Sequence, residues 1–159
     1  MQNQLILKAQ ATIDKGVKPQ DRSAYDKIVM AGTKLMYSQQ THKMLMEGFD
    51  QAPDKIKSAA EGMVGVLGLL YKQSRNTMPV VPMIQAGMAL LLDALDFLEQ
   101  AGFIQVTAQE LGKATKDYMD AILPKVGITP QMMQAVMAKT QGAMQDPQMM
   151  AQIKQNAGG

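Results

Sequence analysis

Few side chains of this 159-residue chain have the chemistry for catalysis or metal binding. There is no cysteine, which excludes thiol catalysis and iron–sulfur clusters, and His42 is the only histidine, which excludes a metal site with two histidine ligands. His42 lies among apolar residues at helical spacing, so we interpret it as a packed side chain. Asp93, Asp96 and Glu99 could bind a cation or act as general acid and base. One helix supplies few ligands, however, and no other group pairs with them, so we interpret them as a solvated helix face.

Methionine is the remaining side chain with ligand chemistry, because its thioether suits copper(I). Copper sites normally add histidine or cysteine and repeat methionine at closer spacing, so we expect neither a metal nor a cofactor. Residues 130–159 contain six methionines and seven glutamines and no aromatic residue. Methionine packs well against surfaces of irregular shape, so we expect this segment to contact other chains. The residues expected to make these contacts are Met132, Met133, Met137, Met149 and Met150.

The overall composition indicates a helical protein. Hydrophobic residues make up 47% of the chain, but only 4% are aromatic and there is no tryptophan, which favours helices over a β-sandwich. The net charge of +2 is too small to argue for nucleic-acid binding, and we expect no sequence-specific recognition of DNA or RNA. The first sixteen residues have an apolar run of only three, which is not typical of a signal peptide. We expect a bundle domain over residues 1–127 and an extension over 128–159.

The apolar periodicity predicts an all-α fold: a bundle with one long helix, an apolar helical hairpin and a Met/Gln-rich pair of short C-terminal helices. The long helix is expected because the residues of one helix face, which would pack against a neighbouring helix, follow one another at spacings of three and four between residues 20 and 49. The short helices are expected because Pro130 and Pro147 each follow a capping residue and precede a methionine pair. The other helices are predicted over residues 3–14, 53–73, 78–99 and 108–123.

The predicted hairpin, residues 53–99, has two further features. Gly62, Gly65 and Gly68 recur every third residue, and each costs about 0.8–1 kcal/mol relative to alanine inside a helix, so we expect close helix–helix contact there. The apolar runs of the two arms are shorter than the roughly 20 residues of a membrane span. We favour a core hairpin and keep membrane insertion as the alternative. The residues assigned to hairpin packing or membrane contact are Gly62, Gly65, Gly68, Leu69, Leu70, Leu90 and Leu91.

Two resemblances to known families arise from these segments. The repeated Thr-Pro-Gln-Met-Met and Asp-Pro-Gln-Met-Met turns resemble the short helices of cochaperone and ubiquilin modules, which cup hydrophobic segments. The chain as a whole is similar to small virion proteins of tailed bacteriophages, and the apolar hairpin and Gln/Met-rich end resemble the ejection proteins of podoviruses. That resemblance implies packaging in the virion and release into the host envelope, where the protein would help to form a DNA-translocating channel.

We therefore expect a non-enzymatic virion protein of the ejection type. Its expected partners are further copies of itself, other virion proteins and the host membrane, with DNA passing through the assembly. Two alternatives remain open. One is a soluble helical binding module or chaperone that shields an apolar partner segment, and the other is a holin-like membrane protein.

Overall fold

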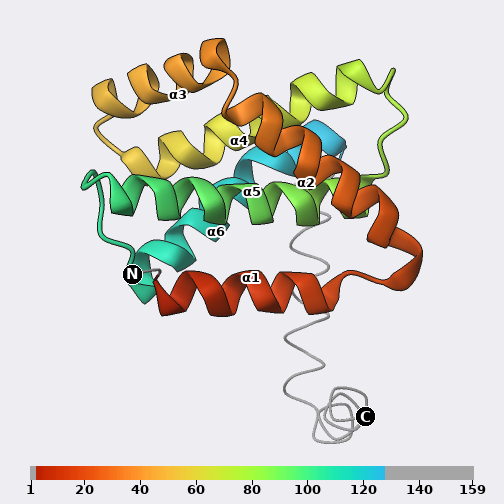
Figure 1. Ribbon diagram of the computed structural model, residues 1–159, viewed down its shortest axis with the longest axis horizontal. Helices are drawn as coiled ribbons and strands as arrows, with labels where there is room; N and C mark the ends of the chain where they lie inside the picture. Colours follow the sequence, from red (N-terminus) through yellow and green to blue (C-terminus); the bar gives the residue numbers. More distant parts are fainter. Residues whose placement is uncertain (1–2, 128–159) are drawn as a thin grey trace, which may run out of the picture. The chain divides into compact units, whose positions relative to one another are not determined.

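The computed structural model describes residues 3–127, which are helical with no strand among them (Figure 1). The predicted all-α fold is thus confirmed for this part of the chain. Contacts divide the chain into two units, Met1–Ile122 and Leu123–Gly159. The first unit contains α1 (Gln4–Gly16), the 3-10 helix η1 (Pro19–Asp21), α2 (Arg22–Met36), α3 (Gln39–Gln51), α4 (Lys55–Gln73), α5 (Val80–Gln100) and α6 (Ala108–Ile122). The 3-10 helix η2 (Pro124–Val126) belongs to the second unit.

The centre of the first unit is α5, which packs against α1, α2, α4 and α6 (Figure 1). Leu90, Leu91, Leu95 and Leu98 are completely buried, because helices cover α5 on several sides. Among the described residues, α5 is the one helix long and apolar enough to cross a membrane by length and composition. Here 56% of its most apolar stretch is buried inside the bundle, so α5 serves as the core helix.

The predicted long helix over residues 20–49 is wrong, because the chain forms two helices there. Tyr37 and Ser38 leave the helical conformation, with Ser38 extended at φ −65° and ψ 146°. The Ser38 hydroxyl donates to the Leu35 carbonyl (2.7 Å), a local bond that competes with helix continuation. The spacings of three and four continue across this break, so periodicity alone does not reveal it.

The remaining helices begin and end close to their predicted bounds. Thr107 accepts a hydrogen bond from the Glu110 backbone (3.2 Å) and thereby caps α6, which begins at Ala108 as predicted. Gly102 has φ +84° and follows the last turn of α5, as expected for a glycine that ends a helix. The start of α4 differs from the prediction: Asp54 is its N-cap and accepts from Lys57 N (3.1 Å), so Pro53 precedes the helix rather than lying in its first turn.

Candidate functional site

The acidic residues of α5 are half-buried, so their predicted role as a solvated face is wrong. The reason is that α1 packs along α5 and Gln10 donates to the Asp93 carboxylate (2.8 Å). Burial, followed by the nearby charge of Asp96, raises the pKa of Asp93, and the hydrogen bond from Gln10 opposes this rise. Asp96 accepts from Gln100 (2.8 Å), while its other oxygen is buried and has no partner among the described residues.

Glu99 connects the start of the chain to the loop after α5. Both of its carboxylate oxygens accept from the Asn3 side chain (3.1 Å each), and one also accepts from Val106 N (2.6 Å). Asn3 in turn donates to the Val106 carbonyl (2.9 Å) and caps α1 by accepting from Leu5 N (2.8 Å). The Glu99 carboxylate is therefore occupied by structural hydrogen bonds.

His42 lies in an aromatic cluster. Its ring stacks on Tyr37 with centroids 5.9 Å apart and meets the edge of Phe97 at 5.6 Å. Within residues 3–127, no group of three or more His, Cys, Asp or Glu side chains is arranged to hold a metal ion. The geometry around His42 is that of packing between α3 and α5, as the sequence suggested.

The structure separates the seven hairpin residues into two groups. Leu70, Leu90 and Leu91 lie in the core, with 6%, 0% and 0% of their surfaces exposed, so lipid can reach them only if the bundle opens. Gly65, Gly68 and Leu69 are exposed, and Gly62 lies between the two groups, half-buried against α3.

The glycines of α4 differ in what surrounds them. At Gly62 a Cβ atom would lie 2.9 Å from Leu45 Cδ2, so α3 and α4 approach closely there, as predicted. At Gly65 and Gly68 a Cβ atom would meet open space, so close contact within the bundle does not explain these two residues. Leu69, beside them, is 47% exposed. We call Gly65, Gly68 and Leu69 the α4 stripe.

The predicted contact residues of the C-terminal segment, Met132, Met133, Met137, Met149 and Met150, lie outside the described residues. The two short helices predicted at Pro130 and Pro147 also lie outside them.

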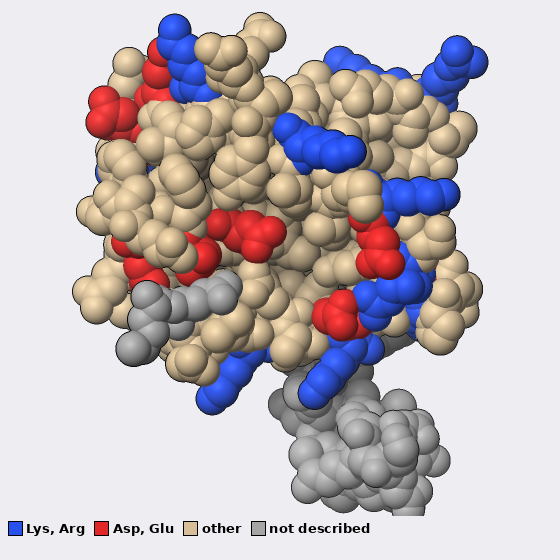
Figure 2. Space-filling view, in the orientation of Figure 1, with Lys and Arg blue, Asp and Glu red and all other residues tan. Residues whose placement is uncertain are grey.

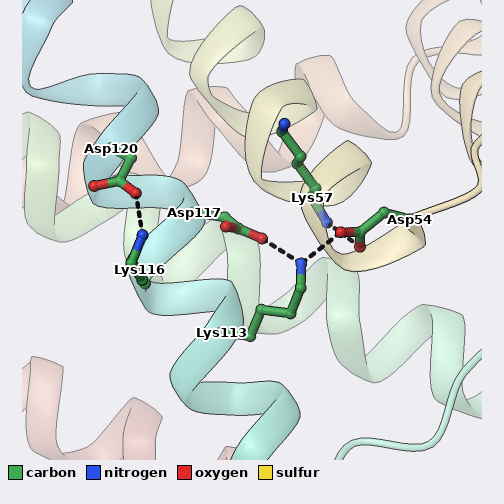
Figure 3. A network of polar contacts seen from close by, with 6 residues as sticks. All are labelled: Asp54, Lys57, Lys113, Lys116, Asp117 and Asp120. Carbon is green, nitrogen blue, oxygen red and sulfur yellow. Dashed lines mark hydrogen bonds and ion pairs between the residues drawn. The ribbon is translucent and has the colours of Figure 1, made fainter.

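Charged side chains link α4 to α6 on the surface (Figure 3). Lys113 Nζ lies 2.6 Å from both Asp54 and Asp117, and Lys116 pairs with Asp120 one turn further along α6 (2.7 Å). The hydrogen bond from Lys113, followed by that from Lys57 N, lowers the pKa of Asp54. Every carboxylate in this network has a cation or backbone donor beside it, so the network fixes α6 on α4.

A shallow groove of about 360 Å³ runs between α2 and the turn from α4 to α5. Its lining is mainly apolar and includes Ile28, Ala31, Leu70 and Met78, with Lys27 at its edge. Sequence reasoning missed this surface, because it depends on how α2 lies against the hairpin. One signal was visible: between Gly62 and Leu92 the only charged residues are Lys72 and Arg75.

The described residues therefore offer surfaces for contact: the α4 stripe, the groove beside α2 and a group of cations near the α4–α5 turn. The half-buried carboxylates are engaged mainly in hydrogen bonds that hold α1 and the α5–α6 loop in place. Comparisons of the chain with protein-family models, with curated proteins and with solved structures found no match in any of the three.

Proposed function

We propose that this chain is a non-enzymatic virion protein of a tailed bacteriophage. In this proposal it is an ejection protein that forms oligomers and helps to build a DNA-translocating channel through the host envelope. Its partners are copies of itself and other virion proteins. It resides in the virion and reaches the host envelope after ejection.

The observation that carries the proposal is the α4 stripe. Gly65 and Gly68 lie inside a helix, where each costs about 0.8–1 kcal/mol relative to alanine. Neither makes a close contact that alanine would prevent. A helix from another chain could approach α4 closely along these two residues, with Leu69 beside them, and such packing would account for both glycines.

Two further features support a role in assembly rather than catalysis. Asp93 and Glu99 hold α1 through Gln10 and Asn3, so they act in packing. The Met-rich residues of 130–159 supply adaptable apolar side chains for a second contact surface. The assignment to a bacteriophage rests on the resemblance in composition and in the apolar hairpin.

Sedimentation velocity over a range of concentrations tests the proposal. We expect the full chain to form discrete oligomers and Gly65→Leu/Gly68→Leu to remain monomeric, because leucine at these positions would keep a second helix away. Gly112→Leu is the matched control, since Gly112 is also an exposed glycine within a helix and has open space around it. A full chain that stays monomeric, or oligomers that persist equally in the double variant, would contradict an assembly role for the α4 stripe.

A second measurement addresses the C-terminal segment. We expect a chain that ends at Gly127 to assemble less well than the full chain, because residues 130–159 carry the expected Met contacts. Equal assembly of the two chains would remove those methionines from the proposal. Circular dichroism of both chains establishes that the bundle itself has folded.

The groove between α2 and the α4–α5 turn favours a second candidate function, a binding module or chaperone that shields an apolar segment. Its lining by Ile28, Ala31, Leu70 and Met78 suits an apolar side chain. This candidate predicts a monomer that binds apolar peptides and leaves vesicles intact. Ala31→Glu would then abolish peptide binding, whereas Gly65→Leu would not change it.

A further inference from the structure

The end of the bundle around the α4–α5 turn carries unpaired positive charge. Lys72 in the last turn of α4 and Arg75 in the turn itself are both exposed. No acidic residue occurs from Gly62 to Leu92, so the hairpin contributes positive charge only.

Helix α2 adds two more cations, of which one lies beside this turn and the other lies further along the helix. Lys27 lines the same groove as Ser74 and Thr77, which places it next to the α4–α5 turn. Lys34 lies two helical turns further along α2 and is exposed. Within residues 3–127, none of the four cations takes part in an ion pair, since those pairs involve other residues. Figure 2 shows Lys and Arg atoms without Asp or Glu atoms at the upper right of the molecule, the region of the α4–α5 turn in Figure 1.

A large apolar side chain lies beside these cations. Met30 is 60% exposed and lies about one helical turn from Lys27 on α2. In this arrangement a lysine keeps its charge at a lipid phosphate while the neighbouring apolar group enters the lipid interface.

We propose that this cationic end, formed by Lys27, Lys72 and Arg75 with Met30, binds the surface of an anionic lipid bilayer. The complementary charge is the lipid phosphate, and Met30 enters the headgroup region while the core leucines stay buried. A duplex nucleic acid also offers phosphates, but its backbone provides no apolar surface for Met30. A lipid surface therefore accounts for both the charges and the exposed apolar side chain.

This inference rests on the proposed function for the identity of the membrane, which would be the host envelope. The surface contact differs from insertion of the hairpin, because it uses residues that are already exposed. It gives the oligomer a defined face toward the bilayer before any opening of the bundle.

Flotation of the full chain with vesicles tests the inference. One vesicle preparation is phosphatidylcholine alone, and the other contains about one third phosphatidylglycerol. We expect binding to the anionic vesicles only, with weaker binding at higher salt. Each cation near an anionic surface strengthens binding about fivefold, so Lys72→Gln/Arg75→Gln should weaken it about 25-fold. Lys8→Gln/Lys15→Gln is the matched control, since it removes the same charge from exposed positions of α1.

Three results would overturn the inference. They are no binding by the full chain, equal binding to both vesicle preparations, and an equal loss in the control variant. The full chain could instead bind duplex DNA and no vesicles, with the DNA binding lost in Lys72→Gln/Arg75→Gln. The ligand of this surface would then be a nucleic acid and not a lipid. Sedimentation without lipid measures the oligomeric state separately. Oligomers that form in solution but do not bind vesicles would therefore refute lipid binding by this surface without contradicting the proposed assembly.

Discussion

The contact between Gly87 of α5 and Tyr118 of α6 provides a quantitative test of the core packing. A Cβ atom at position 87 would overlap Tyr118 Oη and Leu67 Cδ1 and would lie 2.9 Å from Tyr118 Cζ. Tyr118 is completely buried, and its hydroxyl donates to the Ile84 carbonyl (2.8 Å). The ring therefore cannot turn away without losing this hydrogen bond. We predict that Gly87→Ala destabilises the bundle, although alanine is the better helix former.

Three contributions set the size of the loss. Overpacking a tight core position costs about 1–3 kcal/mol. A buried Tyr118 hydroxyl that loses its partner costs about 1–3 kcal/mol more. The higher helix propensity of alanine returns about 0.8–1 kcal/mol. The net loss is about 3 kcal/mol, equivalent to a melting temperature about 10 °C lower for a domain of this size.

Thermal and urea unfolding followed by far-UV circular dichroism measure this loss. Gly112→Ala is the control, because it adds a methyl group to an exposed helical glycine with open space around it, and it should gain about 0.8–1 kcal/mol. The variant Tyr118→Phe removes the overlapping hydroxyl, so Gly87→Ala should cost at least about 1 kcal/mol less in that background. A Gly87→Ala chain as stable as the parent, or two substitutions with additive effects, would refute this account of the packing.

Three further predictions concern the polar contacts. Asp93→Asn should raise the melting temperature at neutral pH, because a raised pKa means that the folded state disfavours the charged carboxylate. Thermal scans across pH should show this gain shrinking as the pH falls through the raised pKa of Asp93, because the parent carboxyl then becomes protonated, and a constant gain would contradict the assignment. Lys113→Ala should cost less than about 1 kcal/mol in urea unfolding at neutral pH, because the network is largely exposed. This cost should disappear below the lowered pKa of Asp54, and a cost that persists there would show that lost packing, not charge, is responsible. Glu99→Gln should cost about 2 kcal/mol, because charge-assisted bonds to Val106 N and Asn3 are weakened, and faster amide exchange at Leu5 should accompany the loss.

The sequence predicts most of the helices, because apolar spacing and caps are local signals. Thr107 and Gly102 mark their helix ends through bonds and backbone angles within a few residues. The break at Ser38 escaped prediction, since the apolar spacing continues through it and the competing hydroxyl bond depends on a side-chain rotamer.

Long-range contacts determine the parts that the sequence does not reveal. The spacing of Asp93 predicts a solvated residue, but Gln10 of α1, 83 positions earlier, lies against it. Gly62 and Gly65 look equivalent in sequence, yet only Gly62 meets another helix, because Leu45 of α3 lies beside it. For the same reason the groove and the cationic end emerge only once α2 lies against the hairpin.

The attachment of α1 has a consequence for the order of events during protein synthesis. Gln10 bonds to Asp93, 83 positions later in the chain, and Asn3 bonds to Val106, 103 positions later. At about 5–20 residues per second, the ribosome needs about 4–17 s to make the residues between Gln10 and Asp93. A helix of 13 residues is only marginally stable alone in water. During this interval α1 has no partner helix to pack against. Its docking is therefore a late step, because α5, the helix against which it packs, is made only at the end of this interval.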